Sequence, residues 1–423
     1  MKIVVIGSGL IGVTTAYFLA WDGHGVTVVD RRDGPGKETS FANGGLLTPS
    51  MADPWNSPGS WRTLLASVGR PDSAMKLRMR ALPSLAGWGL RFLRNSSPEA
   101  FERNTRNNLH LAKYSLEVMN VIRADTNVKY GRSARGTLRI FRNSLALQGA
   151  VRAAEHWTAE GLPLRDLTVP EVMSLEPGLA PIAATLAGGI HYPGDEAGNA
   201  YQFCVGMKEA AARIGVEFEF DAQVQGLTLQ GGRVAEAVTT RQRLSADAFV
   251  VAAGSYSPFL MRGVRIALPV RPVKGYSVTL KCLPGDTLGI PVVDDELHAV
   301  VTPLDGGIRV AGTAEFTGYD LRLRPERIAN LMGLARRVLP NVEFDASTAK
   351  PWCGLRPMSA DGVPIVGATS ISNLFVNTGH GHLGWTMAAG SAKVLADLIS
   401  GRSPTIDPRP YELQRFGSGL KAA

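Results

Sequence analysis

The first thirty residues alternate between apolar runs and short polar breaks in the order strand, turn, helix, strand. An apolar run at Ile3–Ile6 precedes a glycine-rich turn, a helical stretch "LIGVTTAYFLA" follows, and a second apolar run, "VTVVD", ends at Asp30. Apolar runs of this length are typical of strands that are buried on both faces of a parallel sheet. The pattern therefore predicts a parallel α/β unit at the start of the chain.

Two later segments have the pattern of the same unit. Ala248–Ala253 has the composition of a buried strand that ends in a glycine, and "LFVNTGHGHLGWTMAAGSAKVLADLISG" that of a short strand, a glycine loop and a helix. Gly401 is the predicted stop of this helix, in which residues recur at helical spacing: Met387, Ser391, Val394, Leu395 and Leu398. We expect all three segments to lie in one domain.

The blocks between these segments follow other patterns. Residues from about 55 to 193 are helix-rich and basic, and residues from about 269 to 343 contain strand-like runs such as "YSVTLKC" and "IRVAGTAEF". This order predicts an α/β (α+β) fold in which a nucleotide-binding domain is interrupted twice by a mixed-sheet, substrate-facing domain. We place residues 1–54, 194–260 and 350–423 in the first domain and residues 55–193 and 261–349 in the second.

The first glycine turn has the spacing of a dinucleotide-binding loop. Gly7, Gly9 and Gly12 form G-x-G-x-x-G between a predicted strand and a predicted helix, and Asp30 ends the next strand. The first glycine permits the turn, the second lets a pyrophosphate approach the backbone, and the third lets helix and strand pack closely. The helix N-terminus would then face the phosphates, and the Asp30 carboxylate can accept hydrogen bonds from a ribose.

Composition narrows the function classes. The chain has 423 residues, 45% hydrophobic and 19% charged, which is typical of a folded protein of two or three domains. Its three cysteines are far apart and form no CxxC pair, so we expect a reducing compartment and neither a disulfide framework nor a zinc site. Glycines interrupt the N-terminal run, which argues against a cleaved signal peptide, and no apolar run is long enough to span a bilayer.

The net charge of +8 is unevenly spread. The stretch "MKLRMRALPSLAGWGLRFLR", Met75–Arg94, interleaves Arg with Leu, Trp and Phe. This pattern suits a helical hairpin with a solvated basic face or, alternatively, contact with an anionic membrane surface. We therefore expect a cytoplasmic protein, with peripheral binding to the inner face of the cell membrane as the alternative. No stretch resembles an RNA- or DNA-binding module, so no nucleic-acid partner is expected.

Two further glycine segments favour FAD over a nicotinamide cofactor. "NTGHGHLGW" opens the C-terminal helix, and a helix N-terminus there would stabilise negative charge on a reduced flavin ring. "TSFANGGLL", residues 39–47, sets Ser40 and Asn43 beside glycines, where they can hydrogen-bond the polar edge of a ring.

The chain resembles the small subunit of bacterial D-amino acid dehydrogenases, a branch of the FAD-dependent D-amino acid oxidase/glycine oxidase family. The matching stretches are "VVIGSGLIGV", "ETSFANGG", "GTLRIFR", "DEAGNAYQF", "AAGSYS", "PVKGYSVTL", "GLRPMSADGVPIVG" and "NTGHGHLGWTMAAGS". The resemblance implies a glutathione-reductase-type, FAD-binding Rossmann domain interrupted by a mixed-sheet substrate domain. It also implies oxidative deamination of D-amino acids to 2-oxo acids and ammonia, with electrons passed to a quinone-type acceptor.

Two stretches depart from the pattern of that family. His382 stands in the last glycine turn where a small or hydroxyl residue is expected, so the space over the flavin is expected to differ. The loop "SFANGGLLTPSMADPW" also differs, which would shift substrate choice toward a cyclic D-imino acid such as D-hydroxyproline. An oxidase or dehydrogenase acting on glycine or sarcosine is a further alternative.

One arginine stands out in the apolar segment "WCGLRPMSADGVPIVG". Oxidation at Cα needs orientation of the substrate more than acid–base groups, and the planar fork of Arg356 can bind the substrate carboxylate with two hydrogen bonds. The structural alternative is that Arg356 pairs with Asp361, the nearest acid downstream. Tyr276 is a candidate helper at the same carboxylate, and Lys274, on the same strand face, is a candidate for an electrostatic role near the flavin.

Other side chains near the predicted flavin are given smaller roles. His380 and His382 are expected beside the ring, neither of them as a general base. Cys353 lies one residue away from the position at which related amine oxidases attach flavin, so we expect non-covalent FAD. The full set of predicted cofactor-binding residues is Gly7, Ser8, Gly9, Leu10, Ile11, Gly12, Asp30, Arg31, Arg32, Ser40, Asn43, Gly44, Gly45, Val224, Ala253, Gly254, Gly354, Arg356, Gly379, His380, Gly381, Leu383, Gly384, Trp385 and Thr386.

Two other function classes stay open at this point. A flavin-dependent RNA-modifying protein would use the positive charge, although the basic residues are dispersed and lack interleaved stacking aromatics. A non-catalytic, FAD-binding subunit of a larger complex is the other alternative. The oligomeric state does not follow from the sequence.

Overall fold

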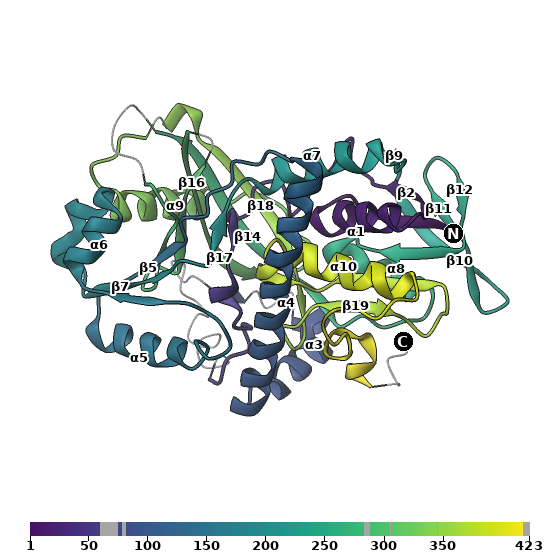
Figure 1. Cartoon of the computed structure of the whole chain (residues 1–423), viewed down its shortest axis with the longest axis horizontal. Coiled ribbons are helices and arrows are strands. Elements are labelled where there is room, and N and C mark those ends of the chain that lie inside the picture. The colour runs from purple at the N-terminus through teal and green to yellow at the C-terminus, as the bar shows by residue number, and fades with distance from the viewer. Residues whose placement is uncertain (60–74, 78–81, 283–287, 305, 345, 418–423) are drawn as a thin grey trace.

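A computed structural model describes residues 1–59, 75–77, 82–282, 288–304, 306–344 and 346–417, and two sheets dominate this part of the chain (Figure 1). The six-stranded sheet has the order β19-β20-β13-β1-β2-β9. Its neighbouring strands run parallel except β19 and β20. Its members are β1 (Lys2–Ile6), β2 (Gly25–Val29), β9 (Glu217–Glu219), β13 (Ala248–Val251), β19 (Ile365–Ala368) and β20 (Leu374–Thr378).

The three segments predicted to share a domain are neighbours in this sheet, since β13 lies between β1 and β20. The apolar side chains of β1 at Ile3–Ile6 are buried, as is typical of β-branched residues in a parallel sheet that is covered on both faces. The predicted α/β fold class is confirmed.

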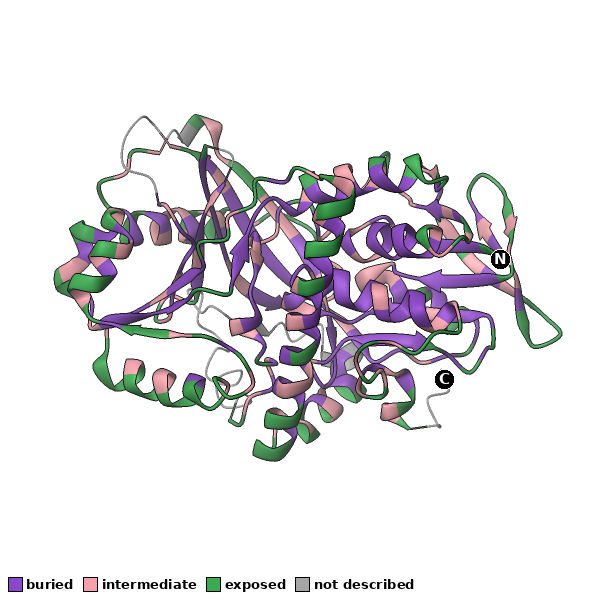
Figure 2. Cartoon of the chain, in the orientation of Figure 1, coloured by how far each residue is buried: buried purple, intermediate pink, exposed green. Residues whose placement is uncertain are grey.

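Helices cover one face of this sheet and share one hydrophobic core. They are α1 (Leu10–Trp21), α4 (Pro98–Thr126), α7 (Ala200–Arg213) and α10 (Ala388–Ile399). The other face packs against a small antiparallel sheet and α8 (Ser257–Gly263). The strands of that small sheet are β10 (Val224–Gln230), β11 (Arg233–Thr239) and β12 (Arg243–Ser245). Figure 2 shows the resulting buried centre of this half of the molecule.

The second sheet is mixed and has the order β18-β14-β17-β16-β15-β5-β7-β6, with β4 beside β17. Helix α9 (Pro325–Val338) packs on it, α3 (Leu82–Arg94) contacts β14, and α5 (Ser144–Glu155) and α6 (Val169–Leu175) cover its far end. Its strands are β4 (Met75–Leu77), β5 (Thr137–Phe141), β6 (Arg165–Leu167), β7 (Gly188–Tyr192), β14 (Val270–Lys281), β15 (Val292–Asp294), β16 (Ala299–Leu304), β17 (Gly307–Phe316) and β18 (Lys350–Ser359). A two-stranded ladder, β3 (Leu46–Leu47) with β8 (Glu196–Ala197), completes the strands.

The packing differs from the predicted division of the chain in two places. Helix α4 comes from the block assigned to the second domain, yet it packs on α10 in the core of the first. Strand β18 comes from the block assigned to the first domain, yet it pairs with β14 in the mixed sheet. Such long-range pairings depend on tertiary contacts that a local pattern does not encode.

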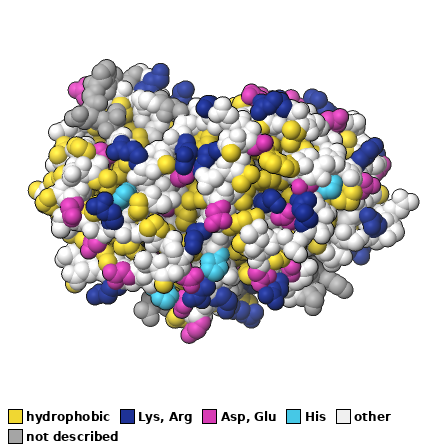
Figure 3. All heavy atoms as spheres, in the orientation of Figure 1, with side chains coloured by type: hydrophobic (Ala, Val, Ile, Leu, Met, Phe, Trp, Pro, Cys, Tyr) yellow, Lys and Arg dark blue, Asp and Glu magenta, His cyan; other side chains and the backbone are white. Residues whose placement is uncertain are grey.

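Membrane-spanning helices and metal-binding clusters are two features that bear on the function class. None of the described helices combines the length and the apolar character needed to cross a membrane. The described residues also contain no cluster of three or more His, Cys, Asp or Glu side chains that could hold a metal ion. On the face shown in Figure 3, Lys and Arg side chains are interspersed with Asp and Glu.

Candidate active site

A cavity of about 1170 Å³ lies where the two sheets meet. Its wall combines the first glycine loop, the segment from Glu38 to Ser57, the end of β13, strands β14 and β18, and the turn that precedes α10. Segments far apart in the sequence therefore share one enclosed space, which is the arrangement expected of a ligand site between two domains.

The first glycine loop leaves no room for side chains. Gly7 has a φ of +108°, and a Cβ there would lie 2.6 Å from the carbonyl oxygen of Ala252. A Cβ on Gly12 would lie 1.8 Å from the carbonyl oxygen of Gly7. Helix α1 starts at Leu10, directly after Gly9, so its first N–H groups face the cavity edge. This geometry is that of a phosphate cradle at a helix N-terminus.

Asp30 shapes this loop as well as lining the cavity. One of its carboxylate oxygens accepts hydrogen bonds from the backbone N–H and the hydroxyl of Ser8, each at 2.7 Å, and the other accepts from the backbone N–H of Arg32 at 2.9 Å. Arg31 and Arg32 both form ion pairs with Glu38, and Arg31 also stacks over the Tyr256 ring at 3.8 Å. Ser8 and Arg32 thus support the cradle from behind.

The loop that contains Ser40 and Asn43 is held by both sheets. The Ser40 hydroxyl accepts from the backbone N–H of Leu10 at 3.2 Å, which ties the loop to α1. From the mixed sheet, Thr302 donates to the carbonyl oxygen of Gly44 at 2.7 Å, and Arg309 donates to that of Asn43 at 3.2 Å. The predicted ring-edge segment is therefore fixed in place on the cavity wall.

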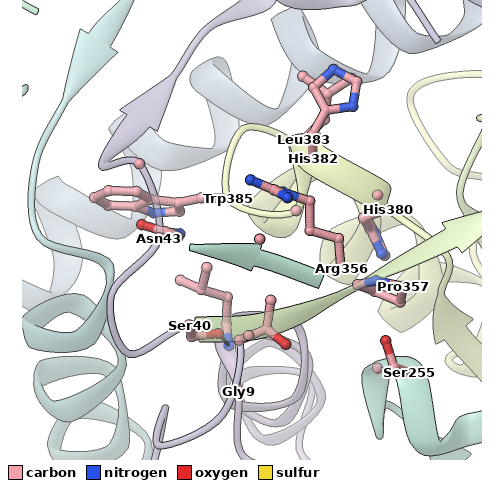
Figure 4. Close-up of a pocket in the computed structure, with 18 of the residues that line it drawn as sticks. Gly9, Ser40, Asn43, Ser255, Arg356, Pro357, His380, His382, Leu383 and Trp385 are labelled. Carbon is pink, nitrogen blue, oxygen red and sulfur yellow. Dashed lines mark hydrogen bonds between the residues drawn. The ribbon is translucent and has the colours of Figure 1, made fainter. Parts of the chain in front are cut away.

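Arg356 points into the cavity from β18 (Figure 4). The space for its guanidinium exists because the neighbouring strand carries Gly275: a Cβ at that position would lie 2.2 Å from Nη1 of Arg356. Nη1 donates to the carbonyl oxygen of Thr313 at 3.1 Å, and the ring of Trp55 lies 5.5 Å from the guanidinium carbon. Burial lowers the pKa of Arg356 to about 10, so the side chain remains a cation near neutral pH.

The structure does not support a local clamp between Arg356 and Asp361. Both oxygens of Asp361 accept hydrogen bonds from Arg415, at 2.7 and 3.0 Å. Among the ion pairs of the described residues, no carboxylate is a partner of Arg356. Arg356 is half-buried, and a partly desolvated guanidinium without a carboxylate partner is unfavourable, so the cavity is suited to an anionic ligand.

Tyr276 and Lys274 are not brought together with Arg356. In the β14–β18 ladder Val273 is opposite Arg356, whereas Tyr276 is opposite Cys353, and successive residues of a strand face opposite sides. Tyr276 contributes to the cavity wall, but its hydroxyl donates to Glu315 at 3.0 Å within the core. The Lys274 ammonium donates to the carbonyl oxygen of Arg322 and lies outside the cavity wall. We therefore do not retain Tyr276 as a ligand of the substrate carboxylate or Lys274 as an electrostatic group beside the flavin.

Glu315 explains why this face of β14 is polar. It forms a fully buried ion pair with Arg327 of α9 at 2.7 Å and accepts from Tyr276. Burial raises the pKa of the Tyr276 hydroxyl and lowers that of the Lys274 ammonium. Cys353, which shares this face, donates to the carbonyl oxygen of Leu321 at 3.1 Å and is absent from the cavity lining. The polar groups on this side hold the sheet to α9.

Both histidines of the last glycine turn, the buried His380 and the half-buried His382, have a lowered pKa and are neutral. Burial lowers the pKa of His380 to about 3, and burial together with the charge of Arg356 lowers that of His382 to about 4. Nε2 of His382 is 3.2 Å from the carbonyl oxygen of Met51, and its ring stacks on Trp55 at 5.3 Å. His382 thus helps to position Trp55 beside Arg356.

Buried polar atoms without partners lie at the same end. Nδ1 of His380 and Nε1 of Trp385 have no hydrogen-bond partner among the described residues, although Nε2 of His380 contacts the Ser391 hydroxyl at 3.0 Å. Unpaired buried polar atoms are costly and mark a site for a ligand. Together with the glycine cradle, they fit a dinucleotide whose ring system carries polar atoms, as FAD does.

Most of the predicted cofactor-binding residues line the cavity, while Ser8, Gly12, Arg32, Gly379 and Thr386 lie behind its wall. Thr386 accepts from the backbone N–H of Thr48 at 3.0 Å, so it acts as a support. Among the residues that line the cavity and that the sequence did not single out are Asp53, Trp55, Arg139, Tyr192, Asp295 and His298. For two of them, Asp53 and Trp55, the sequence gave a signal, because they lie in the stretch "SMADPW" of the loop that departs from the family pattern.

Comparisons with known proteins identify the family of the chain. The model of a protein family described as FAD dependent oxidoreductase matches residues 2–398 of the chain. A D-amino acid dehydrogenase from Paramagnetospirillum magneticum is 43% identical over 425 residues, covering 99% of this chain and 100% of that protein. A D-amino acid dehydrogenase from Chromohalobacter salexigens is 39% identical over 422 residues, covering 99% of this chain and 100% of that protein.

Solved structures share the fold at low identity. Glycine oxidase from Geobacillus kaustophilus superposes with a TM-score of 0.76 at 22% identity, covering 98% of this chain and 99% of that one. L-proline dehydrogenase from P. horikoshii gives a TM-score of 0.77 at 18% identity, covering 99% and 98%. Sequence and structure thus agree, and the chain belongs to the family of FAD-dependent oxidoreductases.

Proposed function

We propose that this protein is a D-amino acid dehydrogenase that converts a D-amino acid and water to a 2-oxo acid and ammonia. The observation that carries the proposal is Arg356, a half-buried guanidinium that no described carboxylate neutralises and that faces the cavity holding the dinucleotide cradle. The names of the two bacterial relatives support the same substrate class. Removal of two electrons and two protons at the Cα–N bond gives an imine, which water then hydrolyses.

The residues of this chain supply binding and orientation. Arg356 binds the substrate carboxylate as a bidentate fork, which fixes which hydrogen of Cα faces the cofactor. Trp55, held by His382, closes the space beside the guanidinium and limits water there, which strengthens the ionic contact. When bound, FAD supplies the two-electron acceptor for this oxidation.

FAD is proposed to bind without a covalent bond, held by the glycine loop, Asp30 and the turn before α10. None of the described cysteines lines the cavity, so no described cysteine sulfur is placed to form a covalent bond with the flavin. Acid precipitation of the purified protein should therefore release the yellow colour into the supernatant. A yellow pellet under a colourless supernatant would show a covalent link, and a colourless native protein would show that no flavin is bound.

Arg356→Ala should leave flavin binding largely intact and lower kcat/KM for D-alanine by a factor of roughly 30 to 1,000. This factor corresponds to a loss of about 2–4 kcal/mol of transition-state stabilisation. Arg356→Lys should recover only part of this loss, because an ammonium group cannot reproduce the planar fork. Turnover should be compared on D-alanine and on an amine that lacks the carboxylate. If the wild type and Arg356→Ala discriminate equally between the two compounds, the arginine is structural.

Gly275→Ala should disturb the placement of the Arg356 guanidinium without a direct contact to the substrate. The added methyl group would lie 2.2 Å from Nη1 of Arg356, so the guanidinium must move. We expect kcat/KM for D-alanine to fall by about 100-fold, because misplacement by about 1 Å costs that much in an oriented site. Gly333→Ala is the matched control, since its Cβ would meet nothing within 4 Å and its activity should match the wild type. Equal activity of both variants would show that the close approach is unimportant.

The electron acceptor is proposed to be a quinone reached at the membrane surface. Helix α3 turns Trp88 and Phe92 into the protein, but Leu90 and Leu93 are 53% and 49% exposed, beside the basic residues Arg91 and Arg94. The described part of α3 thus has both the packed face of a hairpin and an outward apolar-basic strip suited to anionic lipid. Arg78 and Arg80, also part of the predicted basic stretch, lie outside the described residues.

A paired assay tests the acceptor. Reduction of a soluble dye by D-alanine should be much faster than peroxide formation, and quinone in anionic vesicles should also be reduced. Leu90→Glu combined with Leu93→Glu should weaken reduction of the vesicle quinone and spare that of the dye. Peroxide formation as fast as dye reduction would refute the dehydrogenase assignment, and undiminished vesicle activity of the variant would refute the docking of α3.

A further inference from the structure

The cavity has a second charged feature, on the segment Met51–Trp55 beside Arg356. His382 contacts the carbonyl oxygen of Met51 at 3.2 Å and stacks on Trp55 at 5.3 Å, and the Trp55 ring lies 5.5 Å from the guanidinium carbon of Arg356. Asp53 stands between these two anchor points and lines the same cavity. The proposed carboxylate site and Asp53 are therefore parts of one wall.

The Asp53 carboxylate has acceptor capacity to spare. Its side chain is exposed to the cavity, and Oδ1 accepts one hydrogen bond, from the Thr105 hydroxyl at 3.1 Å. No lysine or arginine forms an ion pair with it among the described residues, although the positive charge of Arg139 acts on it. A carboxylate has about four acceptor positions, so most of those of Asp53 are available to a ligand.

Arg139, the cation near Asp53, is already paired with another carboxylate. Nε of Arg139 donates to Asp295 at 3.1 Å, and the Nη2 nitrogen donates to the same oxygen. Asp294 is likewise paired with Arg142. Once these pairs are set aside, Asp53 is a carboxylate at this end of the cavity that has no ion-pair partner among the described residues. A negatively charged substrate side chain would meet Asp53 and Asp295 and gain little from an arginine that is already in use.

We infer that Asp53 is a specificity-determining residue that favours D-amino acids whose side chains end in a cation or a hydrogen-bond donor over those with acidic ends. This inference rests on the proposed function, because it places the α-carboxylate on Arg356 and the side chain toward Asp53. Apolar side chains are accepted without this contact.

Binding can be measured without turnover by using carboxylates that lack the α-amine. Binding to the FAD-loaded protein can be followed through the flavin absorbance. The wild type should bind 6-aminohexanoate more tightly than hexanoate, and Asp53→Asn should reduce this preference, the ratio of the two Kd values, by roughly tenfold. In turnover, the kcat/KM ratio of D-lysine to D-norleucine should fall by a similar factor in Asp53→Asn. The same substitution should raise the ratio of D-glutamate to D-norleucine.

Thr105→Val is the matched control, because it removes the hydrogen bond to Asp53 and keeps the charge. It should retain the wild-type ratios; if it reproduces the change seen in Asp53→Asn, the aspartate is merely structural and the inference fails. Unchanged ratios in Asp53→Asn, with D-alanine still oxidised, would overturn the inference alone. Failure of the wild type to oxidise D-alanine and every other D-amino acid would overturn the proposed function and the inference together.

Discussion

The cation of Arg356, which lines the cavity without a carboxylate partner among the described residues, is the constraint around which the rest of the site is built. Arg356 cannot titrate away near neutral pH, and its one hydrogen bond among the described residues goes to the backbone at Thr313. Desolvation of such a charge is costly unless an anion shares the space. The protein tolerates this cost because Gly275 leaves room for the guanidinium and Trp55 covers it. In the proposed function, the carboxylate of the substrate supplies the missing charge.

The two sheets divide the work. The parallel sheet positions the glycine cradle and Asp30, and the mixed sheet positions Arg356 on β18, so the proposed cofactor and substrate sites come together only when both sheets are folded. The segment from Ser40 to Gly45 joins them, since it hydrogen-bonds to α1 on one side and to Thr302 and Arg309 on the other. The buried Glu315–Arg327 pair fixes α9 to the back of the mixed sheet. Orientation is thus a property of the whole fold.

The sequence predicted what local spacing encodes. The glycine loop, the strands at Ile3–Ile6 and Ala248–Val251 and the helix that ends before Gly401 follow from apolar periodicity and glycine positions. The role of Arg356 was suggested by an isolated cation in an apolar segment. The partners of Tyr276 were not predictable, because the side of the sheet that a residue faces depends on which strand pairs with it and where α9 packs. Arg139 and Asp295 lie far apart in sequence and meet only through the pairing of β5 with β15.

The measurement that tests the role of Arg356 most directly is a crystal structure of the FAD-loaded protein with D-lactate, which has the carboxylate of D-alanine but no amine. The account predicts that both carboxylate oxygens lie within hydrogen-bond distance of the Arg356 guanidinium, beside the Trp55 ring. A carboxylate bound elsewhere in the cavity, with Arg356 still bonded only to the Thr313 carbonyl oxygen, would contradict it.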